Sequence, residues 1–119
     1  MSNKLVIIIK SGREDTEVVS TAIAIGINGL MFDKDVLIVL QGKAVNIARK
    51  GFLGKIFFPP FQPMAEMIDL FIESGGRILV CTPGVEGYHV PKEELIENVK
   101  VAGGAALIAE IEDAQVITY

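Results

Sequence analysis

Three unbroken runs of aliphatic residues constrain most strongly how this chain can fold. "KLVIII" (4–9), "DVLIVL" (35–40) and "RILVC" (77–81) carry apolar side chains at consecutive positions, without the alternation of a half-exposed strand. Strands of this kind are buried on both faces, as in parallel sheets that are covered by helices. The sequence therefore predicts an α/β fold with a mostly parallel sheet and helices on both of its faces.

Helical patterns separate the three runs from one another. Asp15 or Thr16 can cap a helix that runs from Glu17 to about Leu30. Glu17 is the only charged residue of this helix, which indicates that the helix is either deeply buried or in contact with another subunit. A shorter helical segment is expected over residues 44–50, before Gly51.

The second half of the chain continues the alternation. An amphipathic helix is predicted after Pro63, ending at "SGG" before the third strand. A loop should follow that strand, then a helix in "PKEELIENV" (91–99), a helix in "AALIAEIEDA" (105–114) and a final strand in "QVITY" (115–119).

The segment "GFLGKIFFPPFQP" (51–63) concentrates phenylalanine, proline and glycine. Its three prolines exclude a regular helix. One interpretation is a loop that packs on its own domain. The other is a lid over a pocket or a contact between subunits, because exposed apolar patches tend to be interaction sites.

Length, cysteine count and net charge exclude several classes of protein. The 119 residues suggest a single domain spanning 1–119. One cysteine excludes an internal disulfide and a zinc site with several cysteines, and the opening residues lack a signal-peptide pattern, so we expect a cytoplasmic protein. The net charge of −4 argues against a nucleic-acid partner. The longest uncharged stretch, 18–32, is too short to span a membrane.

Cys81, the only cysteine, ends the third predicted strand. Ligands of parallel sheets bind beyond the carboxyl ends of the strands, so topology places Cys81 at the edge where a site would lie. Free cysteine is also often simply buried. In favour of a reactive thiolate are the turn that contains Thr82 and Gly84, a helix N-terminus expected near Pro91, and the nearby cation Lys92.

The remaining candidates surround the same edge. His89 is either a surface hydrogen-bonding group or a stabiliser of the Cys81 thiolate. Gly12 and Arg13, in the turn after the first strand, could border a pocket and hold an anionic group. That turn lacks the glycine spacing of phosphate-binding loops, so nucleotide binding is the weakest of the alternatives.

Several segments together resemble the DsrE/DsrF-like family of small α/β proteins associated with sulfur relay and sulfur oxidation. "SGRED" resembles the family's glycine-acid turn. "MAEMIDLFIESGGRILVCTPGV" resembles its helix, glycine turn and cysteine-ended strand. "PKEELIENVKVAGGAALIAEIEDAQVITY" resembles its closing helix, "GG" break, helix and terminal strand.

The resemblance implies a three-layer α/β/α sandwich with five parallel strands, of which the fifth would come from 99–102 or from part of 51–58. It implies a trimer or hexamer, and a Cys81 that accepts sulfane sulfur as a persulfide and passes it on without a metal or organic cofactor. Some relatives carry a second cysteine where this chain has none, so a two-cysteine mechanism within one subunit is excluded.

The leading hypothesis is thus a sulfur carrier or sulfurtransferase that exchanges sulfur with donor and acceptor proteins or with small thiols. Its site would comprise Cys81 and the neighbouring candidates Gly12, Arg13, Thr82, Gly84, His89 and Lys92. The alternative is a non-catalytic subunit for binding or assembly, in which the cysteine is structural.

Overall fold

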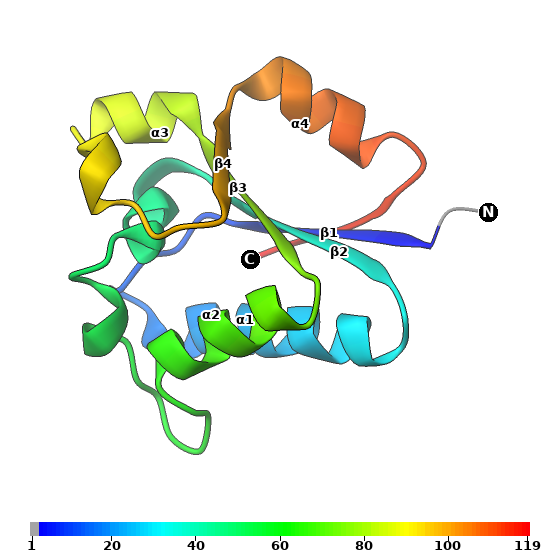
Figure 1. Cartoon of the computed structure of the whole chain (residues 1–119), viewed down its shortest axis with the longest axis horizontal. Helices are drawn as coiled ribbons and strands as arrows, with labels where there is room; N and C mark the ends of the chain where they lie inside the picture. The colour runs from blue at the N-terminus through cyan, green and yellow to red at the C-terminus, as the bar shows by residue number, and fades with distance from the viewer. Residues whose placement is uncertain (1–2) are drawn as a thin grey trace.

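The computed structural model, described over residues 3–119, contains a five-stranded sheet with strand order β4-β3-β2-β1-β5 and only parallel pairings (Figure 1). The strands are β1 (Lys4–Ile9), β2 (Asp35–Leu40), β3 (Arg77–Cys81), β4 (Val99–Ala102) and β5 (Gln115–Thr118). The helices are α1 (Thr16–Met31), α2 (Met64–Glu73), α3 (Thr82–Gly87) and α4 (Gly104–Ile111), and the 3-10 helices are η1 (Gly42–Ala48), η2 (Leu53–Lys55) and η3 (Lys92–Glu94).

The strand order explains which face of the sheet each connection covers. β1 to β4 follow one another across the sheet in one direction, and right-handed crossovers place their connections on one face. The last connection reverses direction to set β5 beside β1, which puts α4 on the opposite face. Figure 1 shows α1 and α2 together on one side of the sheet and α4 on the other. The predicted α/β class and its three layers are confirmed.

The core consists of two clusters, one on each face. On β1, Leu5, Ile7 and Ile9 belong to the cluster beneath α1 and α2, which we call the main cluster. Val6 belongs to the second cluster, beneath α4. The period of two along a strand divides a continuous apolar run between both faces, as expected for a buried parallel strand.

The predicted helix after β1 is confirmed within one residue at each end. The Asp15 carboxylate accepts a hydrogen bond from the backbone N–H of Val18 at 3.2 Å and caps the helix. Two glycines allow α1 to lie close to the sheet, because a Cβ at Gly29 would sit 2.9 Å from Val36 and a Cβ at Gly26 would sit 3.2 Å from Ile38. The inner face of this helix, whose only charged residue is Glu17, is therefore buried in its own subunit.

Two predicted elements of the second half are wrong. The segment 91–99 forms only the short η3, and 82–87 forms α3 instead of a loop. After η3 the chain pairs with residues 48–50, since Ile96 N–H donates to the Ala48 carbonyl and Lys50 N–H donates to the Glu94 carbonyl, both at 2.8 Å. This tertiary pairing overrides a local helical pattern.

The fifth strand is β4, one of the two segments considered for it. The other segment, within 51–63, contains η2 and irregular backbone. Leu53 and Ile56 are buried in the main cluster and Phe61 packs against it, whereas Phe57 is 53% exposed. This loop is therefore packed on its own chain, with one phenylalanine left outside.

Candidate functional site

Cys81 lies where two connections of the sheet diverge. It ends β3 and pairs with Ala102, the last residue of β4. The connection that leaves β3 packs Val90 and Leu95 into the main cluster, whereas the chain leaving β4 continues into α4 on the opposite face. A crevice between diverging connections at the carboxyl ends of parallel strands is a usual place for a ligand.

A cavity of about 350 Å³ opens at this crevice. Its walls come from the segment after β2, the segment after β3 and the start of α4. They are Gln41, Gly42, Cys81, Pro83, Gly84, Tyr88, Gly104 and Leu107. The cavity has the size of a small-molecule site, and no acidic, basic or histidine side chain is among these residues.

Cys81 forms part of the cavity wall, and the residue is only 7% exposed. Burial raises the pKa of the Cys81 thiol above its ordinary value, because a buried thiolate loses its hydration. A hydrogen bond with the Gln41 side chain opposes this rise in pKa. Burial thus favours the neutral thiol of Cys81, whereas Gln41 favours the thiolate.

Close packing between α3 and η1 shapes one wall of the cavity. A Cβ at Gly84 would lie 2.6 Å from Val45 Cγ1 and 2.9 Å from the Gly42 carbonyl oxygen. Gly42 has a φ of +57°, which turns the chain sharply after Gln41. Gly84 is thus the one predicted binding residue, besides Cys81 itself, that lines the cavity, and its missing side chain allows α3 to approach.

The other residues predicted around Cys81 lie outside the cavity wall. Thr82 is the first residue of α3 and is partly buried. His89 is exposed beyond the end of α3, and Lys92 is exposed in η3. The helix whose N-terminus was expected near Pro91 does not form. The causes of the pKa shift at Cys81 are burial and Gln41, with no contribution from His89 or Lys92.

Gly12 and Arg13 belong to a neighbouring group of contacts. The backbone N–H of Gly12 donates to Glu14 Oε1 at 2.8 Å, and Glu14 pairs with Lys43 at 3.1 Å. The Arg13 guanidinium lies 4.7 Å from the centroid of the Phe52 ring, a cation–π distance. These contacts hold the turn after β1 against η1 and the 51–63 loop, and neither residue lines the cavity of Cys81.

Reasoning from sequence places the segment "QGK" (41–43) at the same edge of the sheet but does not name Gln41, Tyr88 or Leu107 as neighbours of Cys81. Gln41 had a usable signal, because it directly follows a buried strand that is adjacent to β3 in the sheet. Tyr88 and Leu107 had none, since the positions of α3 and α4 relative to Cys81 depend on tertiary packing. No group of three or more His, Cys, Asp or Glu side chains that could hold a metal ion occurs within residues 3–119.

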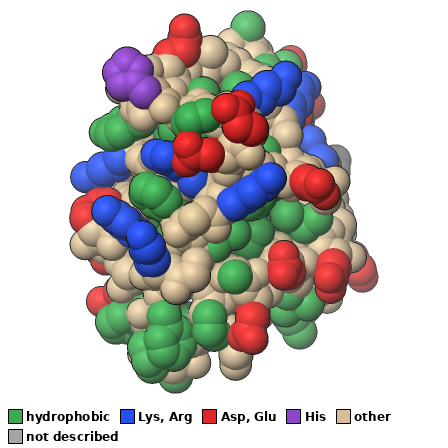
Figure 2. Space-filling model, turned by 60° about the vertical axis from the view of Figure 1, so that its left-hand side comes forward, with side chains coloured by type: hydrophobic (Ala, Val, Ile, Leu, Met, Phe, Trp, Pro, Cys, Tyr) green, Lys and Arg blue, Asp and Glu red, His purple; other side chains and the backbone are tan. Residues whose placement is uncertain are grey.

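Charged side chains near the carboxyl ends of the strands do not form a patch of a single charge. Figure 2 turns that side of the molecule forward and shows Lys and Arg interspersed with Asp and Glu. The surface around the cavity therefore carries charges of both signs, whereas the residues of its wall are uncharged.

Comparison with known families agrees with this geometry. A model of the DsrE/DsrF-like family matches residues 3–119. The chain belongs to the DsrE/DsrF-like family. This family is associated in general with sulfur relay. A search of curated proteins finds no match to this sequence.

Solved structures share the fold at low sequence identity. The YchN protein of E. coli matches with a TM-score of 0.83 and 17% identity, covering 100% of both chains. Protein BT1422 of Bacteroides thetaiotaomicron matches with a TM-score of 0.72 and 19% identity, over 98% of this chain and 95% of that one. MTH1491 of Methanobacterium thermoautotrophicum matches with a TM-score of 0.67 and 16% identity, over 98% of this chain and 97% of that one. Both of the latter are described as proteins of unknown function.

Proposed function

We propose that this protein is a sulfur carrier that holds sulfane sulfur as a persulfide on Cys81. The observation that carries the proposal is that the only cysteine of the chain lines a cavity at the crevice of the sheet. The association of the family with sulfur relay supports it. A surface loop would expose the persulfide to every thiol in solution, whereas a cavity limits which thiols reach it.

The chemistry requires only the thiolate and a sulfur donor. The Cys81 thiolate attacks the outer sulfur of a donor persulfide, R–S–SH, and a new S–S bond forms as the donor S–S bond breaks. The electron pair leaves on the donor as RS⁻, and the proton stays on the transferred sulfur. The persulfide then yields its outer sulfur to an acceptor thiolate in the same way, so no metal or redox cofactor takes part.

Intact mass spectrometry tests the carrier directly. The protein is incubated with sodium polysulfide, passed through a desalting column and weighed, with C81S as the matched control. We expect the wild type to gain mass in steps of one sulfur atom, which dithiothreitol removes, and C81S to gain none. If a small free thiol gains sulfur under these conditions and the wild type does not, the proposal is wrong.

A specific observation favours a second candidate, an assembly or binding subunit with a structural cysteine. Cys81 is 7% exposed, and burial raises the pKa of its thiol. Alkylation with iodoacetamide separates the two candidates. A carrier should be alkylated in the folded state, at a rate that increases with pH, whereas a structural cysteine should react only after denaturation.

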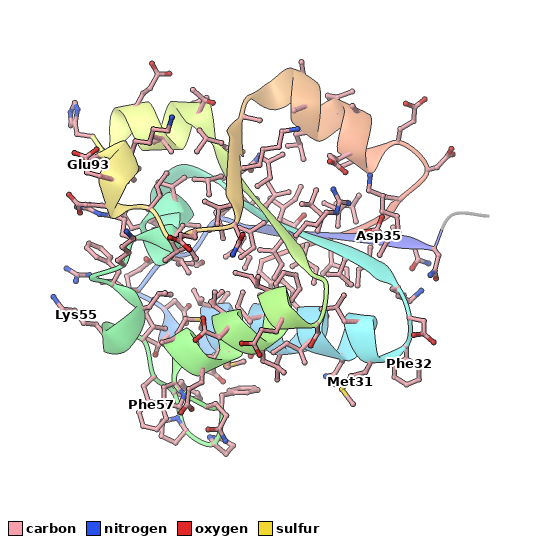
Figure 3. The ribbon with its side chains drawn as sticks, viewed as in Figure 1. Met31, Phe32, Asp35, Lys55, Phe57 and Glu93 are labelled. Carbon is pink, nitrogen blue, oxygen red and sulfur yellow. The ribbon has the colours of Figure 1, made fainter. Side chains whose placement is uncertain are left out.

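We also propose that the chain forms a homo-oligomer, such as the trimer or hexamer that the family resemblance implies. Large apolar side chains remain exposed on several elements. Met31 and Phe32 at the end of α1 are 74% and 80% exposed, and Ile108 on α4 is 65% exposed. Figure 3 shows Met31, Phe32 and Phe57 projecting away from the body of the chain. Surfaces of this kind are typical of interaction sites.

Light scattering after size exclusion tests this assembly against the chain mass of 12.8 kDa. We expect a mass three or six times larger for the wild type, and a lower mass for I108E if α4 lies in an interface. A109S, at an exposed neighbouring position of the same helix, is the control that should not alter the mass. A wild type of 12.8 kDa at micromolar concentration would contradict the proposal.

Donor and acceptor partners follow from the proposed chemistry as persulfide-bearing proteins or small thiols. We place the protein in the cytoplasm, where a single unpaired thiol remains reduced. The structure adds that no helix within residues 3–119 is long and apolar enough to cross a bilayer.

A further inference from the structure

The backbone of the sheet places Gln41 and Cys81 at neighbouring strand ends. Leu40, the last residue of β2, pairs with Val80 of β3, so the residues that follow them, Gln41 and Cys81, are neighbours. The Gln41 backbone is fixed on both sides, because its N–H donates to the Ile9 carbonyl and its carbonyl accepts from the Ala44 N–H, both at 3.0 Å. A side chain on such a rigid position is well placed to orient a reacting group.

In many reactive-cysteine sites a nearby cation stabilises the thiolate, and here the Gln41 amide is the group in a position to do so. Gln41 and Cys81 line the same cavity, and the Gln41 side chain lowers the pKa of the Cys81 thiol against the rise that burial causes. Among residues 3–119, the cavity wall includes no Lys, Arg or His side chain, and Tyr88 is its only titratable residue besides Cys81. Of the side chains in this wall, Gln41 therefore carries the N–H donors suited to a negative charge on sulfur.

We propose that Gln41 is a catalytic residue of this site, which donates a side-chain N–H to the Cys81 sulfur and stabilises its thiolate. The inference rests on the proposed carrier function and specifies how the thiol is activated. An N–H donor favours the ionised sulfur over the neutral thiol, since a thiolate is the stronger hydrogen-bond acceptor. The same contact fixes the direction in which the sulfur faces the cavity.

The test measures the rate of iodoacetamide alkylation of Cys81 against pH in the wild type, Q41E and Q41L. Q41L removes the donor, and Q41E retains the shape of the side chain but places a negative charge beside the sulfur. We expect alkylation at pH 7 to be roughly tenfold slower in Q41L and slower still in Q41E, with the pH profile displaced upward. Q62L, which alters a glutamine outside this cavity, is the control that should retain the wild-type profile.

The two substitutions keep the test decisive if one of them disturbs folding. Circular dichroism identifies the folded variants, and one folded variant suffices. A folded Q41L or Q41E with the wild-type pH profile would overturn the assignment of Gln41. A merely structural role would alter the melting temperature without displacing the pH profile.

The assay also separates this inference from the proposed function. If the wild type gains no sulfur from polysulfide and Q41L still displaces the alkylation profile, the carrier function fails and the assignment of Gln41 to thiolate stabilisation remains. If the wild type gains sulfur and Q41L gains it at the same rate and with the same pH profile, the carrier function remains and Gln41 is excluded.

Discussion

The two faces of the sheet are covered very differently. The face beneath α1 and α2 carries the main cluster, to which the first three connections all contribute buried side chains. Within residues 3–119, the second cluster contains only five buried residues, Val6, Leu37, Val39, Leu79 and Cys81. The helix over them, α4, has no buried residue of its own. The candidate site therefore belongs to the thinly covered face, and the well-packed face provides its rigid support.

This contrast explains how the fold can contain a cavity on one face and still be stable. Close packing of the main cluster stabilises the three central strands, which fixes Gln41 and Cys81 at adjacent strand ends. On the second face, α4 is attached by ion pairs from Glu110 to Lys4 and to Arg77 at the opposite end of the sheet from Cys81. Stability thus depends mainly on the main cluster, whereas the candidate site lies on the second face, and the following substitutions test this division.

The largest expected effect is on the main cluster. Phe71 of α2 is fully buried, and its ring would lie 2.4 Å from a Cβ at Gly76. Phe71→Ala should lower the free energy of unfolding by about 3–5 kcal/mol in urea denaturation, because it leaves a cavity in close-packed surroundings. Leu107→Ala on α4 should cost only about 1 kcal/mol, since that side chain is partly exposed. Equal losses would show that the two faces do not differ as described.

A glycine at the junction of the two layers gives the next largest effect. Gly84→Ala places a Cβ 2.6 Å from Val45 Cγ1, so α3 must move away from η1. We expect the free energy of unfolding to decrease by about 1–3 kcal/mol and the alkylation rate of Cys81 to change, because the cavity wall moves. Gly87→Ala, in the same helix with no neighbour within 4 Å of the added Cβ, is the matched control. A Gly84→Ala variant as stable as Gly87→Ala would contradict the close approach.

The smallest expected effect concerns the attachment of α4. Hydrogen bonds from Arg77 and Lys4 hold the pKa of Glu110 below its usual value. A lowered pKa stabilises the folded state above the unfolded pKa, about 4.3, and this contribution is lost as the pH falls through the folded value. Glu110→Gln should therefore cost up to about 1 kcal/mol at pH 7, and the difference from the wild type should disappear in acid.

Denaturation curves at several pH values measure this difference, with Glu112→Gln as the control at an exposed position at the end of α4. If Glu110→Gln and the wild type differed by the same amount at pH 7 and at pH 3, the ion pairs would not be its cause. The alkylation rate of Cys81 should remain unchanged in both variants, because Glu110 lies at the far end of the helix from the cavity.

Much of the fold was predictable because it depends on local pattern. The runs at 4–9, 35–40 and 77–81 became β1, β2 and β3, since only a doubly covered sheet buries consecutive aliphatic side chains. The segment 91–99 was predicted wrongly because a proline followed by acidic residues is typical of a helix start, whereas the chain leaves η3 to pair with residues 48–50. Such long-range pairing leaves no local signal.

The sequence by itself determined the parallel sheet, the family and the position of one cysteine at a strand end. Only the tertiary structure decided the surroundings of that sulfur. Residues close in sequence, His89 and Lys92, lie outside the cavity wall, whereas Gln41 and Leu107 reach it from other elements. The physical reason is that hydrophobic periodicity fixes which face of each element is buried, and packing then chooses which strand ends and helices meet.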